Sequence, residues 1–120
     1  MQVTFFENET IAAKALRLLE QVPEDKWLLG MYTNRLDKCC VLGHYKRLTS
    51  DNPNDYSEEN CIYKNGGLKD ISILFLLSRM NGHFPDISWV NDGHASQLYP
   101  QPNAKTRSMA LLKDMVKAGY

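Results

Sequence analysis

The stretch Trp27–Leu42, WLLGMYTNRLDKCCVL, decides the fold class of this chain. It holds two largely apolar runs, Trp27–Thr33 and Cys39–Leu42, on either side of the polar segment Asn34–Lys38. Two such runs joined by a short polar connection are typical of a β-hairpin. The alternative for the second run is a short helix over Leu42–Leu48. We favour the hairpin, which would make the protein α+β.

Three helices are predicted around this hairpin. Apolar residues recur every three or four positions from Ile11 to Val22, and Pro23 ends this first helix. The most hydrophobic segment, Leu68–Met80, is predicted to be a central helix that is covered on most sides. The last helix is predicted to begin after the N-cap residue Asn103. Its predicted buried stripe consists of Met109, Leu112, Met115 and Val116.

The segments between the helices are predicted to be one more strand and a long loop. Ile87–Val90 is predicted to be the strand, bounded by Pro85 and by turn residues. The polar segment 49–67 is predicted to be the loop. We therefore expect a single domain over residues 1–120 with three main helices, a short β-hairpin and one further strand.

Charge and composition argue against nucleic-acid-binding, membrane and secreted proteins. The chain of 120 residues carries 14 basic and 14 acidic side chains, so its formal net charge is zero. This removes the electrostatic argument for a nucleic-acid-binding protein or for one that binds an acidic membrane. The chain has neither an apolar run long enough for a bilayer nor the start of a secretory signal. Its cysteine number is odd, so no closed disulfide set is implied and we expect a cytoplasmic protein.

A cysteine-dependent enzyme is one candidate. Cys39 or Cys40 would be the nucleophile and His44 the base, with His83 and His94 as further candidate bases. A structural role for the thiols is favoured, because cysteine is among the most buried residue types. Only the interval between Cys40 and His44 approaches the spacing of a zinc site, so no metal and no other cofactor is predicted.

The start of the last helix is the candidate anion site. It carries Lys105 and Arg107 where the helix dipole is positive and acidic residues are usual. Two cations beside unfilled backbone N–H groups would bind a phosphate. Asn91 and Asp92 follow the predicted strand, where they form a turn or present polar groups to a ligand.

Aromatic residues and glycines complete the list of candidates. Trp27 and Trp89 offer surfaces on which a ligand could stack, although most tryptophans of a small domain serve its core. No lysine–serine pair follows Gly66-Gly67, and the G-x-G-x-x-G fingerprint is absent, so a P-loop nucleotide hydrolase is excluded.

Three short motifs occur in a recognisable order. They are Trp27 with Gly30, then Cys39–Gly43, then Ile87–Asp92 ahead of the closing helix. This order resembles a family of small bacterial and phage proteins of unknown function. Its members carry a tryptophan, a cysteine followed by a leucine-glycine pair, and a late W-N-D motif, which Val90 interrupts here. The resemblance covers about residues 10 to 118; it implies a bacterial or phage origin and assigns no activity.

Together these patterns predict a small binding protein rather than an enzyme. The ligand would be a nucleotide-like or phosphorylated small molecule, or a host protein, held by Asn91, Asp92, Lys105 and Arg107. By analogy we expect a phage-encoded inhibitor that sequesters a nucleotide signal of host defence in the bacterial cytoplasm. The alternatives are the cysteine-dependent enzyme and a protein-interaction module that docks through its central loop. A homo-oligomer would cover the apolar central helix.

Overall fold

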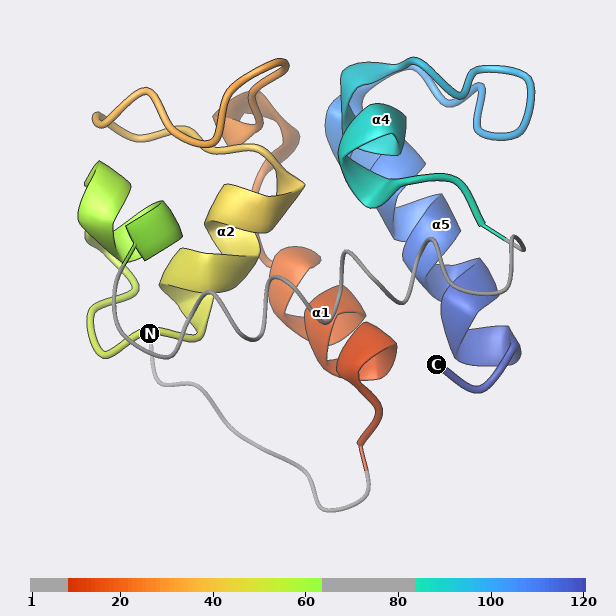
Figure 1. The fold of residues 1–120 in the computed structure, drawn as a ribbon, viewed down its shortest axis with the longest axis horizontal. Coiled ribbons are helices and arrows are strands. Elements are labelled where there is room, and N and C mark those ends of the chain that lie inside the picture. Colours follow the sequence, from red (N-terminus) through yellow and green to blue (C-terminus); the bar gives the residue numbers. More distant parts are fainter. Residues whose placement is uncertain (1–8, 64–83) are drawn as a thin grey trace.

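Helices are the regular elements of the part of the chain that the computed structural model describes, which is residues 9–63 and 84–120. Two of them are single turns, of 3-10 and π type (η1 and η2), and the others are α-helices (Figure 1). In chain order they are α1 (Ile11–Leu19), η1 (Glu24–Lys26), α2 (Val41–Leu48), η2 (Glu59–Tyr63), α4 (Ile87–Asp92) and α5 (Ala104–Lys117).

The first helix begins where the sequence predicts it, but it ends at Leu19 and does not reach the predicted end before Pro23. Thr10 is its N-cap, and the Thr10 hydroxyl accepts a hydrogen bond from the backbone N–H of Ala13 at 3.2 Å. The buried face of α1 packs against α5, and Pro23 follows the end of the helix. The residues of this face are Ala12, Ala15, Leu18 and Leu19.

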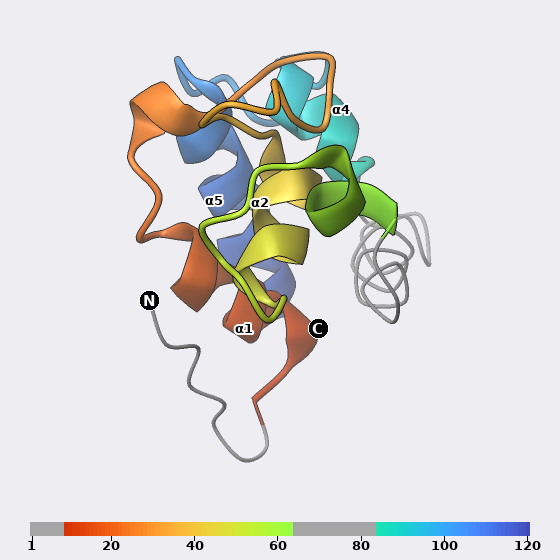
Figure 2. The ribbon, with the colours of Figure 1, turned by 90° about the vertical axis from the view of Figure 1, so that its left-hand side faces the viewer.

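The helix α2 lies at the centre of the described fold. All eight of its residues are buried, and it packs against α1, α4, α5 and η2 (Figures 1 and 2). Gly43 allows this packing, because a Cβ atom there would overlap the carbonyl oxygen of Tyr32 and lie 2.9 Å from the Cβ of Cys39. The segment around Tyr32 therefore lies directly on the first turn of α2.

The predicted β-hairpin is wrong. Trp27 and Thr33 each form an isolated bridge with the same residue, Cys39, and the described residues contain no extended strand. The carboxamide oxygen of Asn34 accepts three backbone N–H groups, from residues 36 to 38, and this curls the chain into a tight loop. The second apolar run enters α2, which confirms the alternative helix, and the described part of the fold is helical rather than α+β.

The predicted strand at Ile87–Val90 is also wrong, because this segment begins α4. The carboxylate of Asp86 caps the helix by accepting the N–H of Ser88 at 2.9 Å. Gly93 ends it in the left-handed conformation, at φ 85°. Ile87 and Val90 are buried on one helical face, so their three-residue spacing fits a helix better than a strand.

The last helix confirms the predicted N-cap. Asn103 and Thr106 form a capping box, in which the Asn103 carboxamide oxygen accepts the N–H of Thr106 at 2.9 Å. Three members of the predicted stripe are buried, but Val116 is exposed and Leu111 takes the fourth buried position. Residues of α1, α2, α4 and α5 share one hydrophobic core cluster.

Several predicted features lie outside the described residues. They are the central helix at Leu68–Met80, the Gly66-Gly67 pair and His83. Among the helices that are described, none combines the length and the apolar character that a bilayer crossing requires.

Candidate functional site

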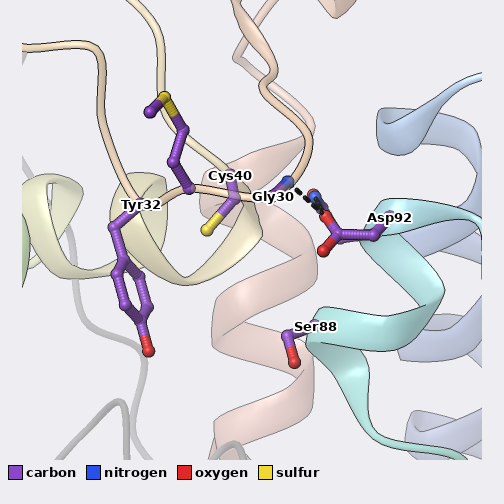
Figure 3. Close-up of a pocket in the computed structure, with 7 residues that line it drawn as sticks. Gly30, Tyr32, Cys40, Ser88 and Asp92 are labelled. Atoms are coloured by element: carbon purple, nitrogen blue, oxygen red, sulfur yellow. Dashed lines mark hydrogen bonds between the residues drawn. The ribbon is translucent and has the colours of Figure 1, made fainter.

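A pocket of about 200 Å³ opens between the segment 30–32, the start of α2 and the helix α4. We call it the α4 pocket. In Figure 3, Tyr32 and Cys40 lie on one side, and Ser88 and Asp92, one turn apart on α4, lie on the other. The lining residues are Gly30, Met31, Tyr32, Cys40, Ser88, Asn91 and Asp92. The structure thus brings Asn91 and Asp92 of the predicted ligand set to one pocket.

The carboxylate of Asp92 is held in one orientation at the pocket edge. Its Oδ1 accepts the backbone N–H of Gly30 at 2.9 Å and the Nδ2 of Asn91 at 2.9 Å (Figure 3). Its Oδ2 accepts no hydrogen bond from any residue that the structure describes. The half-buried group therefore has one oxygen fixed and one oxygen available to a donor.

Asn91 is fully buried and holds Asp92 in this orientation through its hydrogen bond. Its Oδ1 accepts the N–H of Val41 at 3.0 Å, and its Nδ2 donates to the carbonyl of Leu28 at 2.8 Å. One side chain thus joins α4 to the start of α2 and to the chain before Gly30. Its geometry positions Asp92 and leaves little surface of its own for a ligand.

Cys40 places its thiol in the pocket as the N-cap residue of α2 (Figure 3). Burial raises the pKa of the Cys40 thiol to about 11, although the backbone N–H groups of Leu42 and Gly43 act in the opposite direction. At neutral pH the group is a thiol rather than a thiolate. It is therefore a weak nucleophile.

The remaining parts of the predicted cysteine enzyme do not meet. Cys39 lies against Cys61, and the hydrogen bond between the two thiols raises the pKa of Cys39. Burial lowers the pKa of His44 to about 4; its Nδ1 accepts from Arg47 at 3.1 Å, so its Nε2 donates to the Lys26 carbonyl at 2.7 Å. The backbone N of Cys39 lies 3.3 Å from Nε2 of His44, but within residues 9–63 and 84–120 no thiol forms a hydrogen bond with a histidine ring nitrogen. In the same ranges no group of three acidic, His or Cys side chains could hold a metal.

The two predicted cations, Lys105 and Arg107, lie outside the α4 pocket. Both donate hydrogen bonds to backbone carbonyls. The guanidinium of Arg107 donates to the carbonyls of Val90 at 3.0 Å, Asn91 at 2.8 Å and Gln101 at 3.2 Å, and so caps the end of α4. The ammonium group of Lys105 donates to the carbonyl of Glu20 at 2.9 Å. The capping box already satisfies N–H groups at the start of α5. A ligand-binding role for Lys105 and Arg107 stays a prediction.

The two predicted stacking residues differ in environment. Trp27 is buried against His44, with a ring distance of 5.4 Å, and its indole N–H donates to the Val22 carbonyl. Trp89 is 59% exposed, and its ring lies edge-on to the His94 ring with the centroids 5.8 Å apart. Neither residue lines the α4 pocket.

Sequence reasoning assigned Gly30, Met31 and Ser88 to no ligand site, although all three line the pocket. Ser88 and Asp92 are four residues apart, which puts them on one face of either a helix or a strand, but only a helix brings them within one turn of each other. The signal that could have found them is the pair of caps, Asp86 and Gly93, on either side of the segment. Gly30, at φ 73°, marks the turn that brings its N–H to Asp92.

Comparison of the chain with protein-family profiles, curated proteins and solved structures finds no match. The resemblance to small bacterial and phage proteins therefore stays a prediction.

Proposed function

We propose that this protein binds a small ligand in the α4 pocket, and that the ligand donates hydrogen bonds to Asp92. The observation that carries the proposal is the carboxylate itself. One oxygen is fixed by Gly30 and Asn91, and the other has no partner among the described residues. A preorganised acceptor of this kind strengthens binding because no reorganisation is required when the ligand arrives.

The lining residues favour the nucleoside part of a nucleotide-like ligand over its phosphate. Among the residues that the structure describes, the lining includes a carboxylate and no lysine or arginine, so it would repel an anion and accept amino and ring N–H groups. Tyr32 and Met31 supply aromatic and apolar surface beside the acceptor. A volume of about 200 Å³ is below the roughly 300–1,000 Å³ of pockets that hold whole drug-sized ligands, so the pocket would take one ring system.

Binding of this kind needs no nucleophile, and the raised pKa of the Cys40 thiol is consistent with that. The narrower hypothesis is that a phage-encoded protein sequesters a nucleotide signal of host defence. It rests on the resemblance and requires the bound ring to belong to a nucleotide. The cysteine-dependent enzyme and the protein-interaction module stay as alternative predictions.

The experiment is isothermal titration calorimetry of the full chain with guanosine, adenosine, cytidine, uridine and inorganic phosphate. We expect the nucleosides with exocyclic amino groups to bind more tightly than uridine, and phosphate not to bind. Asp92→Asn removes the charge and keeps the shape, so it should weaken binding by about 10- to 100-fold, the range for hydrogen bonds to a charged group. The matched control is Asp25→Asn, an exposed carboxylate outside the pocket. Equal affinity of the Asp92 variant and the control would refute the proposal.

A further inference from the structure

The thiols of Cys39 and Cys61 form a buried pair beside the start of α2. The Sγ atoms of Cys39 and Cys61 lie 3.5 Å apart, and both residues are 0% exposed. The two residues are 22 positions apart and come from different segments, the loop before α2 and the turn η2. We propose that they are a redox-active dithiol, which a low-molecular-weight disulfide such as oxidised glutathione converts to an intramolecular disulfide. This inference is independent of the proposed ligand.

The hydrogen bond between the two thiols distinguishes the two sulfurs, whereas Thr33 and Arg47 lower the pKa of both. The pKa of Cys61 is lowered, first because the Cys39 thiol donates a hydrogen bond to it, and then through Thr33 and the positive charge of Arg47. Arg47 is buried against the Tyr56 ring, 4.3 Å from its centroid, and forms no ion pair with a described carboxylate. Its charge is therefore available to an anion nearby. Cys61 is the thiol that ionises first, and Cys39 is the one that keeps its proton.

Oxidised glutathione is the oxidant in this thiol–disulfide exchange, and the electrons and protons balance. The Cys61 thiolate attacks one sulfur of the glutathione disulfide, which forms a mixed disulfide and releases one glutathione thiolate. That thiolate takes the proton of Cys39, and the Cys39 sulfur then attacks the Cys61 sulfur and releases the second glutathione. Two protein thiols are oxidised by two electrons, and one disulfide is reduced to two thiols. Because both sulfurs are buried, the first step requires a local opening around Cys61 in η2.

The position of Cys39 gives this bond a structural consequence. Its backbone N–H donates to the Lys26 carbonyl at 3.1 Å, and its carbonyl accepts the N–H of Leu28 at 2.9 Å, so Cys39 closes the loop in front of α2. The next residue, Cys40, lines the α4 pocket. A disulfide between Cys39 and Cys61 would tie η2 to the loop in front of α2. It would therefore restrict the motion of Cys40, which lines the α4 pocket.

The test equilibrates the full chain with a series of oxidised and reduced glutathione mixtures. The protein is then unfolded, alkylated and measured by intact mass and peptide mapping. We expect a loss of two hydrogens, one alkylated thiol instead of three, and a cross-link to the peptide of Cys61. The melting temperature of the oxidised protein should rise by about 8–16 °C, the shift expected when a chain of this size gains a loop closure. Three alkylated thiols at every mixture would overturn the proposal.

The neighbouring cysteine provides a matched control. Cys40→Ser retains the pair and should close as the wild type does, whereas Cys39→Ser should show no intramolecular cross-link. A cross-link of Cys61 to Cys40 in the Cys39→Ser variant would contradict the assignment of the pair. The mapping of the wild-type protein decides between Cys39 and Cys40 by fragmentation, so the test stands even if a variant folds poorly.

Discussion

Removing the side chain of Asn91 should destabilise the protein more than most surface changes could. Asn91→Ala deletes three hydrogen bonds, a buried one from Val41 and partly buried ones to Leu28 and Asp92, and leaves the N–H of Val41 without its acceptor. Each such bond is worth about 1 kcal/mol, and an unsatisfied buried donor costs about 1–3 kcal/mol more. We therefore expect the free energy of unfolding to fall by about 4–6 kcal/mol, a large part of the roughly 5–15 kcal/mol of a typical domain.

Urea unfolding followed by tryptophan fluorescence measures this change, because Trp27 is buried in the core. Asn54→Ala is the control, since Asn54 is exposed, and we expect it to change stability by no more than about 0.5 kcal/mol. Asn91→Asp keeps the shape but places a second carboxylate beside Asp92, so it should destabilise the protein as well. A loss below about 1 kcal/mol for Asn91→Ala would refute the inference that this residue joins α4 to α2.

Three further changes test the packing, the capping and the pH dependence. Gly43→Ala should cost about 1–3 kcal/mol in urea unfolding, because its Cβ overlaps the Tyr32 carbonyl. Arg107→Ala should cost about 2–3 kcal/mol, since it uncaps α4, whereas Lys105→Ala should cost less than about 1 kcal/mol; equal effects would contradict this difference. The pKa of His44 is about 4 when folded and near 6.5 when unfolded, so the unfolded chain binds the extra proton between these values. Stability should fall by up to about 3 kcal/mol as the pH drops from 6.5 to 4, and His44→Gln should flatten this slope.

The local sequence predicts the ends of this fold better than its middle. The helices after Thr10 and Asn103 carry an N-cap and a regular apolar stripe, and both begin as predicted, although Val116 of the second stripe is exposed. The chain between them depends on tertiary contacts that no local pattern contains. Trp27 and Thr33 share one bridge partner instead of pairing along a ladder, and Gly43 is needed because another segment lies on it.

The candidate site was predictable in part. The pair Asn91-Asp92 stood out as polar groups at the end of an element, and both residues line the pocket. Their separate roles required the structure, because Asn91 is buried as a support while Asp92 presents an oxygen. The cation Arg107 in the first turn of α5 also has a structural explanation, because it caps the neighbouring helix α4. The residue spacing in the sequence could not reveal this contact.

The most direct test of ligand binding in the α4 pocket is a titration of ¹⁵N-labelled protein with guanosine, followed by NMR. The amide of Gly30 is the most informative signal, because it donates to the carboxylate that we propose as the acceptor. We predict saturable shifts at Gly30, Ser88 and Asp92, with the amides at the start of α5 unchanged. Shifts centred on Lys105 and Arg107 instead, or no shifts at Gly30 at saturating ligand, would contradict the proposed site.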